Sequence, residues 1–273
     1  MHKSKYKSNF ELKLLARIQI GRYPGILIGA IILNFIISIA TANIISTLIP
    51  ANNPFGFIIN YIMLFVAQVF ISVFNVGLSF IFLKSACNMS STIGDLFYGF
   101  QKDPIKALKI GAVISVIDSI CMIPFDIASV ELSSVLGSVD INKLSLMLAN
   151  GSVDNYESLA AYNVFYSTMM KFYLIMLVCA LVSLILTLPF FPAFYMILDF
   201  PEWSATTILK RSFEVMHGNK LRLFLLNLSF IPLYLLSIFT CGLALLFVIP
   251  YAKMTTTNFY LDMMAVRNKS SNN

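Results

Sequence analysis

Long apolar runs, separated by short polar or basic segments, make up most of this chain. Six of the runs approach or exceed the roughly 20 residues that cross the hydrocarbon core of a bilayer. Only Thr240 and Cys241 separate the last two runs, which predicts a tight transmembrane hairpin. The first run is longer than the 7–15 residues of a signal-peptide core, so we expect it to be retained. The spans are expected at about 26–49, 57–83, 107–127, 172–198, 221–239 and 242–263.

A short amphipathic segment precedes each pair of spans. In the first segment Phe10, Leu14 and Ile18 recur at helical spacing, and Lys13 and Arg17 occupy the other face. The pattern predicts an all-α polytopic membrane protein with six transmembrane helices in three hairpins. Each hairpin is preceded by a cytoplasmic interfacial amphipathic helix, and together they form a single transmembrane domain. The three repeated units are about 8–83, 90–198 and 201–263.

Composition and charge support the membrane assignment and set an orientation. The chain is 58% hydrophobic and only 12% charged, whereas an average soluble domain is roughly 25% charged. Its net charge of +6 comes from basic residues that lie beside the apolar runs, so we expect contacts with membrane lipids rather than nucleic acid. Both end segments are basic, and the connection at 131–162 is acidic. The positive-inside rule therefore predicts a multi-pass cell-membrane protein with both termini cytoplasmic.

Asp118 is the most specific single candidate for a functional residue, because it lies near the middle of the third predicted span. An acid at that depth costs about 2.5–3.5 kcal/mol on insertion scales, so it needs a polar partner, water or a proton. Ser115 shares its helical face. The pattern fits a proton-coupled or cation-coupled site, and it equally fits a hydrogen-bonded acid that holds helices together.

Other spans carry polar side chains on one face. In the second span Asn60, Gln68 and Asn75 are aligned, and the fifth span contributes Asn227. Such stripes line water-filled paths in some proteins and form interhelical hydrogen bonds in others. Together with Asp118 and Ser115, these residues are the candidate intramembrane polar site.

The densest basic patch, the second candidate site, is expected to contact lipid headgroups or a partner protein, or simply to set the topology. It consists of Lys210, Arg211, Lys220 and Arg222. Signals for catalysis are weak, because neither His2 nor His217 lies in a known catalytic or metal-binding spacing. The four cysteines show no CxxC spacing. We therefore expect no catalytic residues, no metal and no cofactor.

Several short motifs resemble a bacterial integral membrane family known as domain of unknown function 975. The resemblance covers most of the chain and is strongest after Thr206. Where family members often have an acidic residue, this chain has Asn227, and Leu233 stands near a family Trp position. The resemblance implies a bacterial cell-membrane protein and no settled activity. The motifs are Asp95–Phe100, Leu209–Phe213, Gly218–Phe224, Leu228–Ile231, Thr240–Gly242, Ile249–Tyr251 and Asn258–Tyr260.

Three functions remain open on the sequence. The leading expectation is a non-enzymatic protein that organises or assists membrane processes through helix and lipid contacts, with any membrane-protein partner unidentified. The second is a transporter or channel for a small solute or ion, which would use Asp118 and the polar helix faces. The third is a lipid-modifying membrane enzyme.

Overall fold

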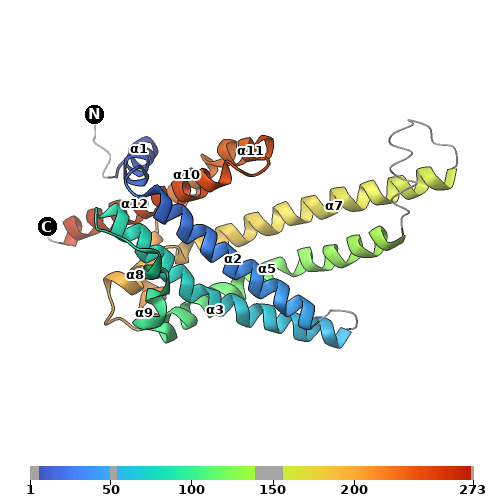
Figure 1. Cartoon of the computed structure of the whole chain (residues 1–273), viewed down its shortest axis with the longest axis horizontal. Coiled ribbons are helices and arrows are strands. Elements are labelled where there is room, and N and C mark those ends of the chain that lie inside the picture. Colours follow the sequence, from blue (N-terminus) through green and yellow to red (C-terminus); the bar gives the residue numbers. More distant parts are fainter. Residues whose placement is uncertain (1–5, 50–53, 139–155, 272–273) are drawn as a thin grey trace. The chain divides into compact units, whose positions relative to one another are not determined.

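The computed structural model describes residues 6–49, 54–138 and 156–271. Two compact units can be recognised: residues 1–115 with 188–273 form the first, and residues 116–187 form the second. Residues 139–155, which make up much of the predicted acidic connection, lie outside the described residues. The helices are α1 (Asn9–Ile20), α2 (Pro24–Leu48), α3 (Pro54–Ala86), η1 (Ile93–Phe97), α4 (Tyr98–Gln101), α5 (Pro104–Ser138), α7 (Tyr156–Thr187), η2 (Leu188–Phe190), α8 (Ala193–Asp199), α9 (Ala205–Met216), α10 (Lys220–Leu228), α11 (Ile231–Phe239) and α12 (Leu245–Ser271) (Figure 1).

The helical, multi-span architecture is confirmed, with five stretches of helix long and apolar enough to cross a membrane among the described residues. The predicted sixth span is not one of them. It falls on α12, whose apolar start is followed by Lys253, Asn258 and Asp262. The five stretches are Pro24–Leu48, Phe55–Ala86, Pro104–Gly137, Tyr162–Asp199 and Lys220–Phe239.

Prolines interrupt two of the spans. The helix after α7 changes to the short 3₁₀ segment η2, which contains Pro189, and resumes only after Pro192. Similarly, α10 and α11 are separated just before Pro232. Proline has no N–H for the preceding turn and clashes with the carbonyl four residues back, which explains both breaks. By contrast, Pro124 and Pro250 lie inside continuous helices.

Helix α3 is central to the first unit and packs against α2, η1, α4 and α8. Two glycines permit its closest approaches. A Cβ at Gly77 would lie 1.9 Å from the carbonyl oxygen of Leu96, and one at Gly99 would lie 2.4 Å from that of Val73. Because no side chain intervenes, the backbone of the 93–101 segment lies directly on α3. Leu96 is fully buried there.

Helix α12 carries unusually polar residues into the interior of the same unit. Thr255, Thr257 and Tyr260 are all fully buried. The Tyr260 hydroxyl donates to Asp199 Oδ2 at 2.5 Å, and the Thr257 hydroxyl is 3.0 Å from the Tyr195 hydroxyl. Buried polar groups are stable when they are hydrogen-bonded. The polar face of α12 is therefore accommodated by partners within the protein.

The second unit consists of the later part of α5 together with α7. Phe125 and Phe172 pack with ring centroids 5.2 Å apart. The Ser183 hydroxyl donates a hydrogen bond to Asp118 Oδ1. Asp118 thus has a polar partner on the neighbouring helix α7.

Candidate functional site

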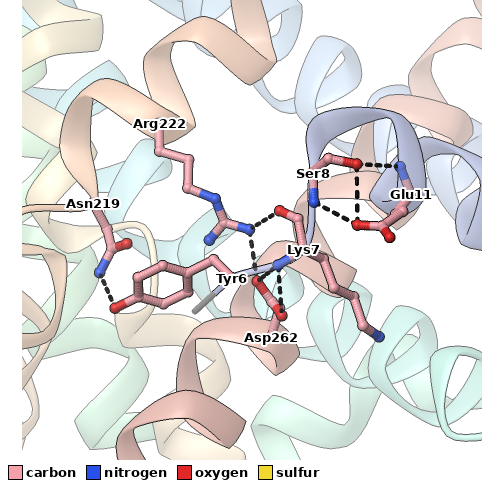
Figure 2. A network of polar contacts seen from close by, with 7 residues as sticks. All are labelled: Tyr6, Lys7, Ser8, Glu11, Asn219, Arg222 and Asp262. Atoms are coloured by element: carbon pink, nitrogen blue, oxygen red, sulfur yellow. Dashed lines mark hydrogen bonds and ion pairs between the residues drawn. The ribbon is translucent and has the colours of Figure 1, made fainter. Parts of the chain in front are cut away.

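A charged cluster lies where α1, α10 and α12 of the first unit meet (Figure 2). At its centre the Asp262 side chain, only 7% exposed, accepts a hydrogen bond from Arg222 Nη2 at 2.6 Å. The backbone N–H of Lys7 also donates to this carboxylate, at 3.2 Å to Oδ2. A buried carboxylate is tolerated when it is paired with an opposite charge and further hydrogen bonds. Asp262 therefore joins three chain segments that are far apart in sequence.

Arg222 holds the other side of the cluster. Its Nη2 also donates to the Lys7 carbonyl oxygen at 2.8 Å. Its guanidinium lies over the rings of Tyr6 and Phe259, at 4.8 and 4.5 Å from their centroids. Arginine combines planar stacking with several donors and stays charged, which suits it to such a buried contact. The interactions fix residues 6 and 7 against α10 and α12.

Helix α1 begins immediately after this contact. Ser8 and Glu11 form a capping box: Ser8 N donates to Glu11 Oε2 at 2.7 Å, and Glu11 N donates to Ser8 Oγ at 3.2 Å. Hydrogen bonds from the Ser8 backbone and side chain lower the pKa of the exposed Glu11 carboxyl. The cap fixes where the helix starts, and so it fixes the direction in which α1 leaves Asp262.

The rest of α1 is also attached to the first unit. Lys13 Nζ donates to the Ser229 carbonyl oxygen at 3.0 Å and lies 4.3 Å from the centre of the Phe230 ring. Burial, followed by repulsion from Arg17, lowers the pKa of Lys13. Lys13 is therefore directed at the break between α10 and α11. In contrast, Phe10, Leu14 and Ile18 form an exposed apolar stripe along α1.

A cavity of about 1000 Å³ adjoins the cluster, between α1 and α12. Asp262 and Lys7 form part of its wall, and Glu11 and Lys269 bring further charges of both signs. Two other lining residues are bonded to each other: Asn258 Nδ2 donates to Gln19 Oε1 at 2.7 Å. Within the described residues, no group of three or more His, Cys, Asp or Glu side chains lies close enough to hold a metal ion.

A second ion pair ties η1 to the end of α3. Lys84 Nζ lies 2.8 Å from Asp95 Oδ2, and each side chain is 18% exposed. Asp95 also accepts from the Thr92 backbone N–H at 2.8 Å. Burial alone would raise the pKa of Asp95, but the hydrogen bonds from Lys84 and Thr92 outweigh it and lower that pKa. The carboxylate is therefore held in its charged form.

The predicted basic patch is divided by the structure. Lys210 and Arg211 are exposed on α9, where Arg211 pairs with Glu214 at 2.9 Å. Lys220 lies 4.2 Å from the centre of the Phe213 ring. Arg222, by contrast, points inward to Asp262, and its side chain is only 18% exposed. Three of the four basic side chains thus remain near the surface.

Two of the predicted intramembrane polar residues share a groove, and the others have separate surroundings within their own units. Gln68 and Asn75 line a groove between α2 and α3. Asn60 instead donates to the carbonyl oxygen of Ile49, at 2.7 Å, just after the end of α2. Asp118 belongs to the second unit and is bonded to Ser183. Ser115 is buried on α5, and Asn227 is partly buried on α10.

Sequence reasoning did not identify Asp262 or its contact with Lys7. Asp262 lies at the end of the run predicted as the sixth span, where it is the only acidic residue. The argument that selected Asp118, an acid within an apolar run, applies to Asp262 as well. Nothing in the local pattern indicates that the acceptor for Lys7 lies 255 positions further along the chain.

Comparison with known proteins gives a family and no activity. A family model described as "Protein of unknown function (DUF975)" matches residues 1–267. No curated protein and no solved structure matches the chain. The match confirms the resemblance seen in the motifs.

Proposed function

We propose, since the chain belongs to the DUF975 family of proteins of unknown function, that it is a non-enzymatic membrane protein that organises or assists membrane processes. One observation carries this proposal. In the first unit, the ion pair of Arg222 and Asp262 and the backbone of Lys7 hold α10, α12 and the segment before α1 together. The ion pair of Lys84 and Asp95 has the same role at η1. Such paired charges stabilise an arrangement of helices, whereas catalysis needs a group that is free to react.

The proposal includes six spans, with both termini on the cytoplasmic side. Five spans alone would separate α1 from the end of α12. However, the hydrogen bond between Lys7 and Asp262 supports placing both residues on the same side of the membrane. A return crossing through α12 would give the even number of spans that goes with this placement. The basic end segments favour the cytoplasm for that side.

The surface proposed to meet the cytoplasmic leaflet is made by α1 and α9. The exposed stripe of Phe10, Leu14 and Ile18 suits insertion at the headgroup level. On α9, Ile208 and Met216 are buried against the first unit, while Lys210 and Arg211 stay exposed. Basic residues near a membrane surface attract anionic lipids by about 1 kcal/mol each. Lipid organisation by this face is therefore the activity we expect.

Purified protein in vesicles that contain brominated phosphatidylglycerol would test the lipid contact, with Trp203 fluorescence as the reporter. Charge reversal, Lys210→Glu with Arg211→Glu, should raise the bromolipid concentration needed for half-maximal quenching by roughly tenfold or more. The matched control, Lys210→Arg with Arg211→Lys, keeps both charges and should behave like the wild type. Equal quenching in all three proteins would remove the basis for lipid organisation.

The same vesicles test the transporter alternative. Because Ser183 donates to Asp118 and an amide oxygen can also accept that bond, Asp118→Asn should leave thermal stability within about 1 kcal/mol of the wild type. A proton-sensitive dye inside the vesicles should report no flux that depends on this residue. Flux that is present in the wild type and lost in Asp118→Asn would show that the protein is a transporter and would contradict the organising role.

A further inference from the structure

The cavity between α1 and α12 is lined partly by apolar and partly by charged residues. Its volume of about 1000 Å³ is at the upper end of the range for small-molecule pockets. Leu15, Leu261 and Val266 contribute apolar surface, and Lys7 and Lys269 contribute basic side chains. The lining therefore suits a molecule that is apolar in one part and charged in another.

The two acids that line the cavity already accept hydrogen bonds from the chain. Asp262 accepts from Arg222 and from the Lys7 backbone. Glu11 Oε2 accepts from both the backbone N–H and the hydroxyl of Ser8, at 2.7 and 3.0 Å. Both carboxylates are thus used to hold the start of α1.

The two lysines of the lining are not used in this way. Both are exposed, and within the described residues neither ammonium group takes part in a hydrogen bond or a salt bridge. Figure 2 shows that the Lys7 side chain extends away from Arg222 and Asp262, which it contacts only through its backbone. Together with Arg222, the lysines give three basic residues against two acids, Glu11 and Asp262. The site therefore carries an excess of positive charge and has donors available for an anion.

The α1 side of the cavity lies next to the exposed apolar stripe of that helix. Each stripe residue is followed directly by a residue that lines the cavity, which is one helical step of about 100°. The neighbouring pairs are Phe10 with Glu11, Leu14 with Leu15, and Ile18 with Gln19. An amphiphile whose apolar chains lie against the stripe can therefore place its charged group in the cavity.

We propose that this cavity binds the phosphate group of a phospholipid from the cytoplasmic leaflet, with Lys7 and Lys269 on the phosphate. Leu15, Leu261 and Val266 would contact the adjoining apolar part of the lipid. This inference rests on the proposed function, which places α1 at the surface of that leaflet. A lysine ammonium binds phosphate as a point charge with several donors. A soluble phosphate ester would meet the same ammonium groups but would leave the apolar side of the cavity in water, which favours the lipid.

Native mass spectrometry of the purified full chain in detergent, titrated with dioleoyl phosphatidylglycerol, tests the two lysines. Lys7→Gln with Lys269→Gln should raise the dissociation constant of the first bound lipid by roughly tenfold or more. Because Lys7 contacts Asp262 through its backbone, this change leaves the buried ion pair in place. The matched control, Lys102→Gln with Lys109→Gln, removes two charges from exposed lysines that do not line the cavity, and it should bind like the wild type. Equal losses in the two double variants would overturn the site.

A second variant obstructs the cavity and keeps every charge. Ala265 lines the cavity and is exposed, so Ala265→Trp adds bulk there without displacing the core. It should weaken lipid binding to a similar extent as the lysine change. Ala40→Trp, at an exposed position on α2 that does not line the cavity, is the control and should have no effect. Unchanged affinity in Ala265→Trp would overturn the cavity as the binding site.

Two further ligands distinguish a lipid from a soluble phosphate ester. Diolein, which lacks the phosphate, should bind roughly tenfold or more weakly than phosphatidylglycerol. Glycerol 3-phosphate, which lacks the chains, should not displace the lipid at equal concentration, and complete displacement would overturn the lipid as the ligand. The cavity site can fail by itself. If its variants bind like the wild type while Lys210→Glu with Arg211→Glu still reduces Trp203 quenching, the proposed function stands and the cavity site is refuted.

Discussion

Removing the Asp262 carboxylate should release α1 from α12. In Asp262→Ala the Arg222 guanidinium, 18% exposed, would lose its charge partner at 2.6 Å. Breaking one side of a buried pair costs about 3–5 kcal/mol. Arg222 keeps its bond to the Lys7 carbonyl and its two ring contacts, so we expect the lower end, about 3 kcal/mol. Hydrogen exchange of the α1 peptide in nanodiscs should accelerate on the order of 100-fold.

Two comparisons make this prediction refutable. The exposed pair of Arg211 and Glu214 is the matched control, and Glu214→Ala should cost less than about 1 kcal/mol. Replacing both partners, Arg222→Met with Asp262→Leu, should cost less than the sum of the two single changes, because no charge is left unpaired. The reasoning fails if Asp262→Ala exchanges like the surface control, or if the double variant loses the full sum.

Two further predictions concern the packing of the 93–101 segment on α3. Gly77→Ala would place a Cβ 1.9 Å from the Leu96 oxygen, so the free energy of unfolding should fall by about 3 kcal/mol in thermal unfolding in detergent. The control is Gly25→Ala, whose new Cβ would have no atom within 4 Å and should not change the stability. Equal melting of the two variants would contradict this. Because the pKa of Asp95 is lowered in the folded state, its contribution with Lys84 is complete above the unfolded pKa of about 4 and lost as pH falls through the folded value. Wild type should therefore be more stable than Asp95→Asn at pH 7, with the difference shrinking below pH 4; a constant difference would refute it.

The spans could be predicted from the sequence because the length of an apolar run is a local property. The first two were expected at 26–49 and 57–83, and the helices run over Pro24–Leu48 and Pro54–Ala86. The start of α9 has a local cause as well, because the Ser204 side chain caps it by accepting from Thr207 N. The sixth predicted span, at 242–263 on α12, is not among the stretches that hydropathy identifies. Its polar residues are sheltered by distant partners such as Asp199, which no window of hydropathy contains.

The candidate site was less predictable for the same reason. Helical spacing placed Gln68 and Asn75 on one face of α3, and both line the groove between α2 and α3. It could not show that Arg222 turns inward while Lys210, on the preceding helix, stays exposed. That difference depends on where α12 places an acid. Pairings across such long separations are decided by tertiary packing rather than by local periodicity.

The bond between Lys7 and Asp262 also bears on how the molecule is made. These residues are separated by 255 positions, so the ribosome adds nearly the whole chain before the acid appears. At roughly 5–20 residues per second, the interval is on the order of 10–50 s. During that time the first helix lacks its contact with α12, and the arginine on α10 lacks its counterion. Formation of the contact between Lys7, Arg222 and Asp262 is therefore a late step in biogenesis, and a nascent chain halted before Asp262 should leave its leading helix more accessible to proteases.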